Sequence, residues 1–142
     1  MNKQIKEYLK NYSNDLNIVN KLIVSAYLEF NNLKAIKNKH ILELLSGNDK
    51  KEIDNFLKLI YNHSEIFSFE DVINLFEITI PSSDIVVNGA IYTPKYIRDY
   101  IINNSVNKLD INERIKIADI ACGSGAFLYT VSKYIKDTTA YN

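Results

Sequence analysis

The chain has 142 residues, which is enough for one domain of ordinary size with a hydrophobic core. Lysine plus arginine and aspartate plus glutamate are both 17, so no net charge attracts a polyanion such as DNA. The single cysteine, Cys122, excludes a disulfide within the chain, and no apolar run is long enough to span a membrane, so we expect a cytoplasmic protein.

Residues 3 to about 80 have the pattern of amphipathic helices, and we expect residues 1–80 to form a helical N-terminal domain. Apolar side chains recur there at the three- and four-residue spacing of a buried helix face. Asn48 or Asp49 is placed to cap one helix, and Ser68 is placed to cap another. The side chains expected to face the core are Ile18, Leu22, Ile23, Ala26, Ile53, Phe56, Leu57, Ile60, Tyr61, Val72, Leu75, Phe76 and Ile78.

A second unit is expected over residues 85–142. Thr93 is placed to cap a helix that begins at Pro94. Residues 115–120 are short and β-branched and predict a strand, residues 121–125 predict a turn, and helical spacing resumes at 126–134. The apolar face of the first of these helices is expected to carry Tyr96, Ile97, Tyr100 and Ile101.

A strand that leads into a helix through a Gly-x-Gly turn is a nucleotide-binding geometry. Small residues let a ligand approach the backbone, amides at the helix start offer donors, and Asp119 can reach a cationic or hydroxylated group. The third glycine of the dinucleotide fingerprint is replaced by Leu128, which disfavours a pyrophosphate and is compatible with S-adenosylmethionine. From these residues alone, an ordinary tight strand–helix turn is an equally good interpretation.

Two short segments resemble known motifs. Residues 119–128, Asp-Ile-Ala-Cys-Gly-Ser-Gly-Ala-Phe-Leu, resemble motif I of the adenine-specific DNA methyltransferases of restriction–modification systems. Residues 89–94, Gly-Ala-Ile-Tyr-Thr-Pro, resemble motif X of the same enzymes. Asp119 follows Pro94 by 25 positions, which fits the circularly permuted class in which motif X comes first. Ile120 stands where the family usually has proline.

The resemblance covers roughly residues 75 to 135. It implies a chain that is mostly α, with a helical N-terminal domain followed by the start of an α/β Rossmann-like, S-adenosylmethionine-dependent methyltransferase fold. It also implies DNA as the substrate, methyl transfer to the exocyclic amine of adenine, and other restriction–modification subunits as partners. By position, the residues that it places at the cofactor are Tyr92, Thr93, Pro94, Asp119, Ala121, Cys122, Gly123, Ser124 and Gly125.

The catalytic motif of this family, Asn/Asp/Ser-Pro-Pro-Tyr/Phe, has no counterpart, because Pro81 and Pro94 are the only prolines. We therefore expect no catalytic residue, no metal ligand and no methyl transfer by this chain alone. We interpret the sequence as an N-terminal fragment of a longer enzyme, in preference to a natural remnant. The alternative function is a helical DNA- or subunit-binding module with a vestigial Rossmann piece. Because one strand leaves its sheet edges unpaired, the structure is expected to be almost all-α.

Several side chains allow a second interpretation. Cys122 could be a nucleophile, but its position in the turn accounts for it. The basic stretch at residues 34–40 could contact DNA phosphates, although a solvated helix face is preferred. Tyr96 and Tyr100 share a helix face and are expected to pack within the protein, not to stack on bases.

Overall fold

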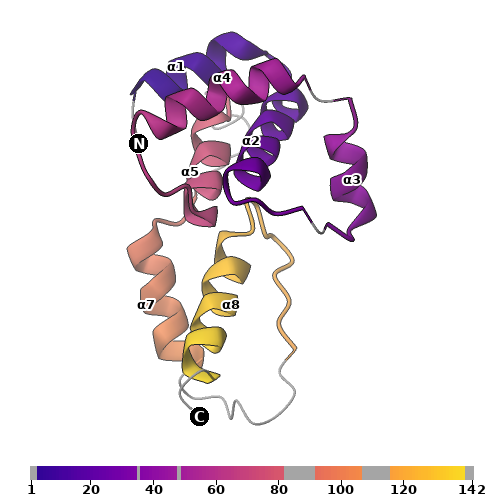
Figure 1. The fold of residues 1–142 in the computed structure, drawn as a ribbon. Helices are drawn as coiled ribbons and strands as arrows, with labels where there is room; N and C mark the ends of the chain where they lie inside the picture. The colour runs from indigo at the N-terminus through magenta and orange to yellow at the C-terminus, as the bar shows by residue number, and fades with distance from the viewer. Residues whose placement is uncertain (1–2, 35, 48, 82–91, 107–115, 140–142) are drawn as a thin grey trace. The chain divides into compact units, whose positions relative to one another are not determined.

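The computed structural model describes residues 3–34, 36–47, 49–81, 92–106 and 116–139, without the side chains of Leu44 and residues 136–139. Within these ranges the regular structure consists of seven α-helices (Figure 1). The chain divides into two compact units, Met1–Asp84 and Ile85–Asn142. The prediction of a mostly helical chain is confirmed. None of the described helices is long and apolar enough to cross a membrane.

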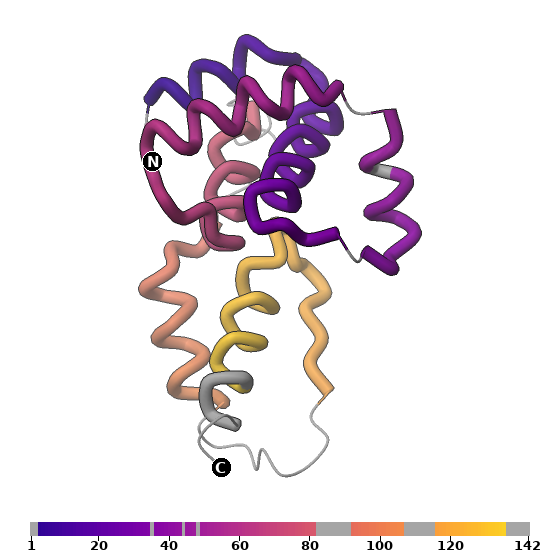
Figure 2. Tube along the Cα trace, viewed as in Figure 1, coloured from indigo at the N-terminus to yellow at the C-terminus, as the bar shows by residue number. Residues whose placement is uncertain are grey.

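The N-terminal unit is a bundle built around α2. In it, α2 contacts α3, α4 and α5, and α1 packs against α5 (Figure 2). Side chains of the preceding turns cap four of these helices at their N-termini, α2 to α5. The helices are α1 (Lys3–Tyr12), α2 (Leu16–Phe30), α3 (Lys39–Leu45), α4 (Lys50–Tyr61) and α5 (Phe69–Thr79).

Two of the predicted caps are formed. Asp49 caps α4, because its Oδ1 accepts a hydrogen bond from the amide of Lys51 at 2.9 Å. Ser68 and Asp71 form a reciprocal capping box at the start of α5. The Asp71 amide donates to the Ser68 hydroxyl at 3.2 Å, and the Ser68 amide donates to the Asp71 carboxylate at 2.8 Å. These bonds satisfy amides that have no partner within the helix, so they fix where each helix begins.

The core of this unit follows the predicted helix faces, with two exceptions. Phe56 and Ile23 are fully buried at its centre. Ile18 is 45% exposed and Tyr61 is 58% exposed, so their predicted places in the core were wrong. Tyr61 lies at the edge, where its ring stacks on Phe30 with centroids 4.8 Å apart. Both residues lie at the border of an apolar face, where spacing alone does not separate buried from exposed positions.

A half-buried tyrosine–glutamate pair joins α1 to α4 at the border of the core. The Tyr8 hydroxyl donates to Glu52 Oε2 at 3.2 Å, and its ring stacks on Phe56 with centroids 5.7 Å apart. Burial raises the pKa of Tyr8 to about 12, and the hydrogen bond to Glu52 and the charge of that carboxylate act in the same direction. The pair therefore stabilises the folded unit only while Tyr8 is protonated.

This pKa predicts a loss of stability at alkaline pH. The unfolded chain loses the Tyr8 proton near its ordinary pKa of 10.0, whereas the folded unit keeps it to about 12. The contribution of Tyr8 is therefore complete below pH 10 and is lost as the pH rises through the folded value. Urea unfolding at several pH values measures this effect. Between pH 10 and about 12, the free energy of unfolding should fall less steeply for Tyr8→Phe than for the wild type. Glu52→Gln should be intermediate, and equal slopes for Tyr8→Phe and the wild type would contradict the assignment.

The second unit contains α7 (Lys95–Val106) and α8 (Ala126–Thr139), which pack against each other. Their shared core is formed by Ile102, Val106 and Val131. The predicted apolar face of α7 was wrong, because Tyr96 is 73% exposed and Tyr100 is 70% exposed.

The buried face of α7 instead runs along Arg98, Ile102 and Val106, at positions i, i+4 and i+8. This buried face is narrower than the predicted face that contained Tyr96 and Tyr100, and it includes the charged residue Arg98. The two aliphatic side chains on it pack with α8, which explains why the helix turns its tyrosines outward.

The predicted strand is not formed within the described residues. Residues 116–119 adopt neither helix nor strand, and residue 115 lies outside the described ranges. Ile117 is 45% exposed and Ile120 is completely exposed. A strand is defined by its pairing with a neighbour, and the described parts of the chain contain no second strand to pair with it.

Candidate functional site

The segment before α8 forms the tight glycine turn that the sequence predicts. The Gly125 amide donates to the Cys122 carbonyl at 2.7 Å, and the Gly125 carbonyl then accepts the Tyr129 amide at 3.0 Å in the first turn of α8. Gly123 and Gly125 have φ angles of +51° and +77°. Side chains rarely tolerate these backbone conformations, so both glycines are required by the shape of the turn.

Asp119 stands at the entrance to this turn. Its Oδ1 accepts the backbone amide of Ala121 at 3.1 Å, which orients the carboxylate beside the turn. Within the described residues, its Oδ2 accepts no hydrogen bond from the protein. Ala121 and Gly123 are both exposed, so the backbone next to this carboxylate is accessible to a ligand.

The structure brings the Tyr-Thr-Pro segment to this turn. A Cβ atom placed on Gly123 would lie 3.2 Å from Cε1 and 3.8 Å from Cδ1 of Tyr92. The tyrosine ring therefore lies directly against the glycine backbone, although the two residues are far apart in sequence. A Cβ on Gly125 would meet nothing within 4 Å, so that side of the turn is open. Gly89, Ala90 and Ile91 lie outside the described residues.

The same segment is tied to the start of α7. The helix begins at Lys95, one residue later than predicted, and the Pro94 carbonyl accepts the amides of Ile97 and Arg98 at 3.0 and 3.1 Å. The Thr93 carbonyl accepts Nη1 of Arg98 at 2.8 Å. Sequence reasoning missed Arg98, because an arginine is ordinarily expected on the exposed side of a helix.

A comparison with known families identifies the segment that holds both motifs. Residues 82–142 match the family model described as N-6 DNA methylase. This segment is similar to the N-6 DNA methylase family. The resemblance to adenine DNA methyltransferases is thereby confirmed for these residues, which include Tyr92–Pro94 and Asp119–Gly125. No curated protein and no solved structure gives a significant match to the chain.

Two further predicted site residues of the N-6 DNA methylase segment lie in the turn itself. Cys122 is a free and exposed cysteine whose sulfur lies 3.9 Å from the Gly123 carbonyl oxygen. Ser124 is half-buried between the two glycines. Neither histidine of the chain lies in this segment, so no imidazole from it is available to activate the thiol.

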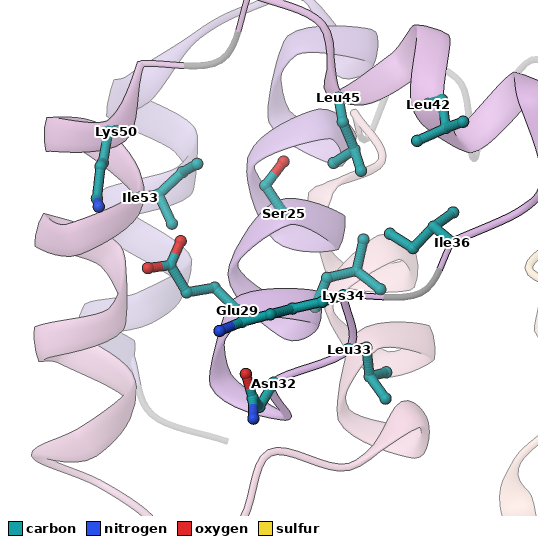
Figure 3. A pocket seen from close by; sticks show the side chains of 11 residues that line it. Ser25, Glu29, Asn32, Leu33, Lys34, Ile36, Leu42, Leu45, Lys50 and Ile53 are labelled. Atoms are coloured by element: carbon teal, nitrogen blue, oxygen red, sulfur yellow. The ribbon is translucent and has the colours of Figure 1, made fainter.

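A groove of the described N-terminal unit lies outside the N-6 DNA methylase segment. This groove has a volume of about 740 Å³ and is bordered by α2, α3 and α4 (Figure 3). Leu33 and Leu42 form part of its apolar lining, and its charged residues are Glu29, Lys34 and Lys50. Because both signs of charge line the groove, it has no uniformly positive surface for DNA phosphates.

Proposed function

We propose that this chain is the part of an adenine-specific DNA methyltransferase that forms one side of its S-adenosylmethionine site. The observation that supports this best is the contact between the Tyr92 ring and the Gly123 backbone. It joins the two motifs that an N-6 DNA methylase carries for its cofactor, and no other described residues combine an open glycine turn with a neighbouring carboxylate and aromatic ring. The proposed Rossmann-like start of the fold comprises these two motifs and the helices α7 and α8.

The chemistry of the groups around the glycine turn fits this cofactor. The carboxylate of Asp119 can accept from the ammonium group of the methionine end or from a hydroxyl. The face of the Tyr92 ring is suited to a cation, because aromatic faces attract positive charge. The open side of Gly125 leaves room for a ligand to approach the backbone. The proposed binding residues are Tyr92, Thr93, Pro94, Asp119, Ala121, Cys122, Gly123, Ser124 and Gly125.

In this proposal the chain binds and orients, and it does not perform the transfer. When bound, S-adenosylmethionine supplies an electrophilic methyl group for the exocyclic amine of adenine in DNA. Asp119 and the turn hold one end of that molecule, and Tyr92 limits its position from the side. The sequence has no counterpart of the family's Pro-Pro catalytic motif, so the chain alone should transfer no labelled methyl group to DNA. Labelled DNA after incubation with the purified chain would contradict this.

The wider setting follows from the same proposal. The parent enzyme is a cytoplasmic component of a restriction–modification system, with DNA and other subunits of that system as partners. The alternative of a helical DNA- or subunit-binding module stays a prediction for residues 1–80. It predicts that duplex DNA or a partner subunit binds this chain equally well after the glycine turn is altered.

Calorimetric titration with S-adenosylmethionine tests the proposal. The wild-type chain should show saturable binding, and Asp119→Asn should weaken it by about tenfold or more, which corresponds to about 1.4 kcal/mol. This variant keeps the Oδ1 acceptor for the Ala121 amide but removes the charge. Asp99→Asn is the matched control, because it removes a carboxylate that pairs with Lys95 on α7. An absence of saturable wild-type binding, or equal affinities for wild type and Asp119→Asn, would refute the assignment.

A further inference from the structure

The second unit buries a charged side chain that has no part in the motifs described above. Arg98 lies on the inner face of α7 and is only 2% exposed. Burying a guanidinium group costs free energy unless hydrogen bonds replace those that it made to water. At least one such bond is formed, because Nη1 of Arg98 donates to the Thr93 carbonyl oxygen at 2.8 Å.

This hydrogen bond reaches out of the helix to the segment that precedes it. Thr93 stands between Tyr92, which contacts the glycine turn, and Pro94, whose carbonyl begins the hydrogen bonding of α7. The ring of proline fixes its own φ angle, and it also restricts the residue before it. Two constraints therefore converge on the Thr93 peptide, one from Pro94 in the backbone and one from the Arg98 side chain.

The position of Tyr92 depends on these constraints. A Cβ atom placed on Gly123 would lie only 3.2 Å from its ring, so the ring lies closely against the glycine backbone. A change in the orientation of the Thr93 peptide would move the adjoining Tyr92 relative to the turn. Arg98 is thus connected to the candidate site through Thr93 and Tyr92, without belonging to either motif.

We propose that Arg98 is a positioning residue, whose hydrogen bond to Thr93 holds the Tyr92 ring against the glycine turn and so shapes the cofactor site. The part of this inference that concerns the cofactor rests on the proposed function. The part that concerns the position of Tyr92 does not depend on it. A residue that served only to fill the inner face of α7 could be replaced by an apolar side chain of similar length without moving Tyr92.

The nuclear magnetic resonance signals of glycine can report the position of the Tyr92 ring. The chain contains four glycines, so a sample with labelled glycine gives a simple magnetic resonance spectrum. The field of an aromatic ring shifts the signals of protons that lie against its face or edge. The shift of the Gly123 α-protons therefore reports the Tyr92 ring, and Tyr92→Leu gives the value without it. Gly47, in the N-terminal unit, serves as an internal reference.

Arg98→Met and Arg98→Lys form the informative pair of variants. Arg98→Met keeps an unbranched side chain that has no hydrogen-bond donors. The chemical shift of its Gly123 α-protons should move from the wild-type value at least half of the way to the value in Tyr92→Leu. Arg98→Lys keeps one charged donor and should return the signal toward the wild-type position. Affinity for S-adenosylmethionine should fall by about tenfold in Arg98→Met and less in Arg98→Lys. A wild-type Gly123 signal in folded Arg98→Met would overturn the proposal.

A measurement on the wild-type chain decides the case in which Arg98→Met does not fold. The chain has two arginines, so Arg114→Lys identifies the guanidinium signals of Arg98. If the bond to Thr93 persists in solution, the Nη hydrogens of Arg98 should exchange with water slowly. Exchange as fast as in free arginine would refute the positioning role. If the wild type fails to bind S-adenosylmethionine, the proposed function fails, while the Gly123 and guanidinium signals still decide the role of Arg98.

Discussion

Replacement of Phe56 by alanine should destabilise the N-terminal unit more than any other single truncation in its core. Phe56 is fully buried, and its ring stacks on that of Tyr8 between α4 and α1. Truncation of a buried phenylalanine costs about 3–5 kcal/mol, through lost transfer free energy and the cavity that remains. A domain has only about 5–15 kcal/mol of stability in total. The variant should therefore be partly or wholly unfolded at moderate urea concentrations where the wild type is folded.

Urea unfolding followed by circular dichroism and by the Gly47 signal measures this loss. Phe69→Ala is the matched control, because Phe69 is 38% exposed and its ring makes an edge-to-face contact with that of Tyr27. The control should lose less than half as much stability as Phe56→Ala. Similar losses for the two variants would show that Phe56 is not the centre of this core.

Replacement of Gly123 by alanine should weaken S-adenosylmethionine binding by about tenfold or more. The new methyl group would lie 3.2 Å from the Tyr92 ring, so the ring or the turn must move. The φ angle of +51° adds a backbone cost, which for a side chain in the left-handed region is about 1–2 kcal/mol. Both effects disturb the place where the two motifs meet, and titration calorimetry measures the resulting affinity.

Gly125→Ala separates these two effects. Gly125 also has a positive φ angle, of +77°, but a Cβ there meets nothing within 4 Å. Its replacement should therefore carry a similar backbone cost and leave the Tyr92 ring in place. We expect a clearly smaller loss of affinity than for Gly123→Ala. If both variants lose the same affinity, the contact with Tyr92 contributes nothing beyond the shape of the turn.

The helical half of the fold could be predicted from local patterns because its stability comes from local and repetitive features. The spacing of Ile53, Phe56 and Ile60 identifies the buried side of α4, and Ser68 and Asp71 identify the start of α5. A helix satisfies its own backbone hydrogen bonds, so such features are readable within a short stretch of sequence.

The inner face of α7 was not predictable in the same way. Tyr96 and Tyr100 are large and partly apolar, so hydrophobicity alone placed them inside and left Arg98 outside. The order is reversed because a buried arginine is tolerable only where acceptors are available, and the Thr93 carbonyl accepts a hydrogen bond from Arg98. That partner depends on how the chain enters the helix, which side-chain spacing does not report.

The candidate site likewise combines features that local sequence predicts with contacts that it does not predict. Gly123 and Gly125 could be assigned to a tight turn from sequence, since few other residues adopt their φ angles. The contact between Tyr92 and Gly123 is tertiary, and only the resemblance to a family suggested that the two segments belong to one site. The strand expected over residues 115–120 failed for a related reason, because strand formation depends on a neighbour that residue preferences cannot supply.

The exposure of Cys122 makes the glycine turn chemically addressable. It is the single cysteine of the sequence, and it lies within the turn, beside the backbone of Gly123. A thiol-directed fluorophore or spin label would therefore attach to the native sequence at one known position, with no other cysteine to remove. The rate of that labelling reports how accessible the turn is, so a molecule that covers the turn should slow the reaction. The natural sequence thus carries its own probe at the place where its function is proposed to lie.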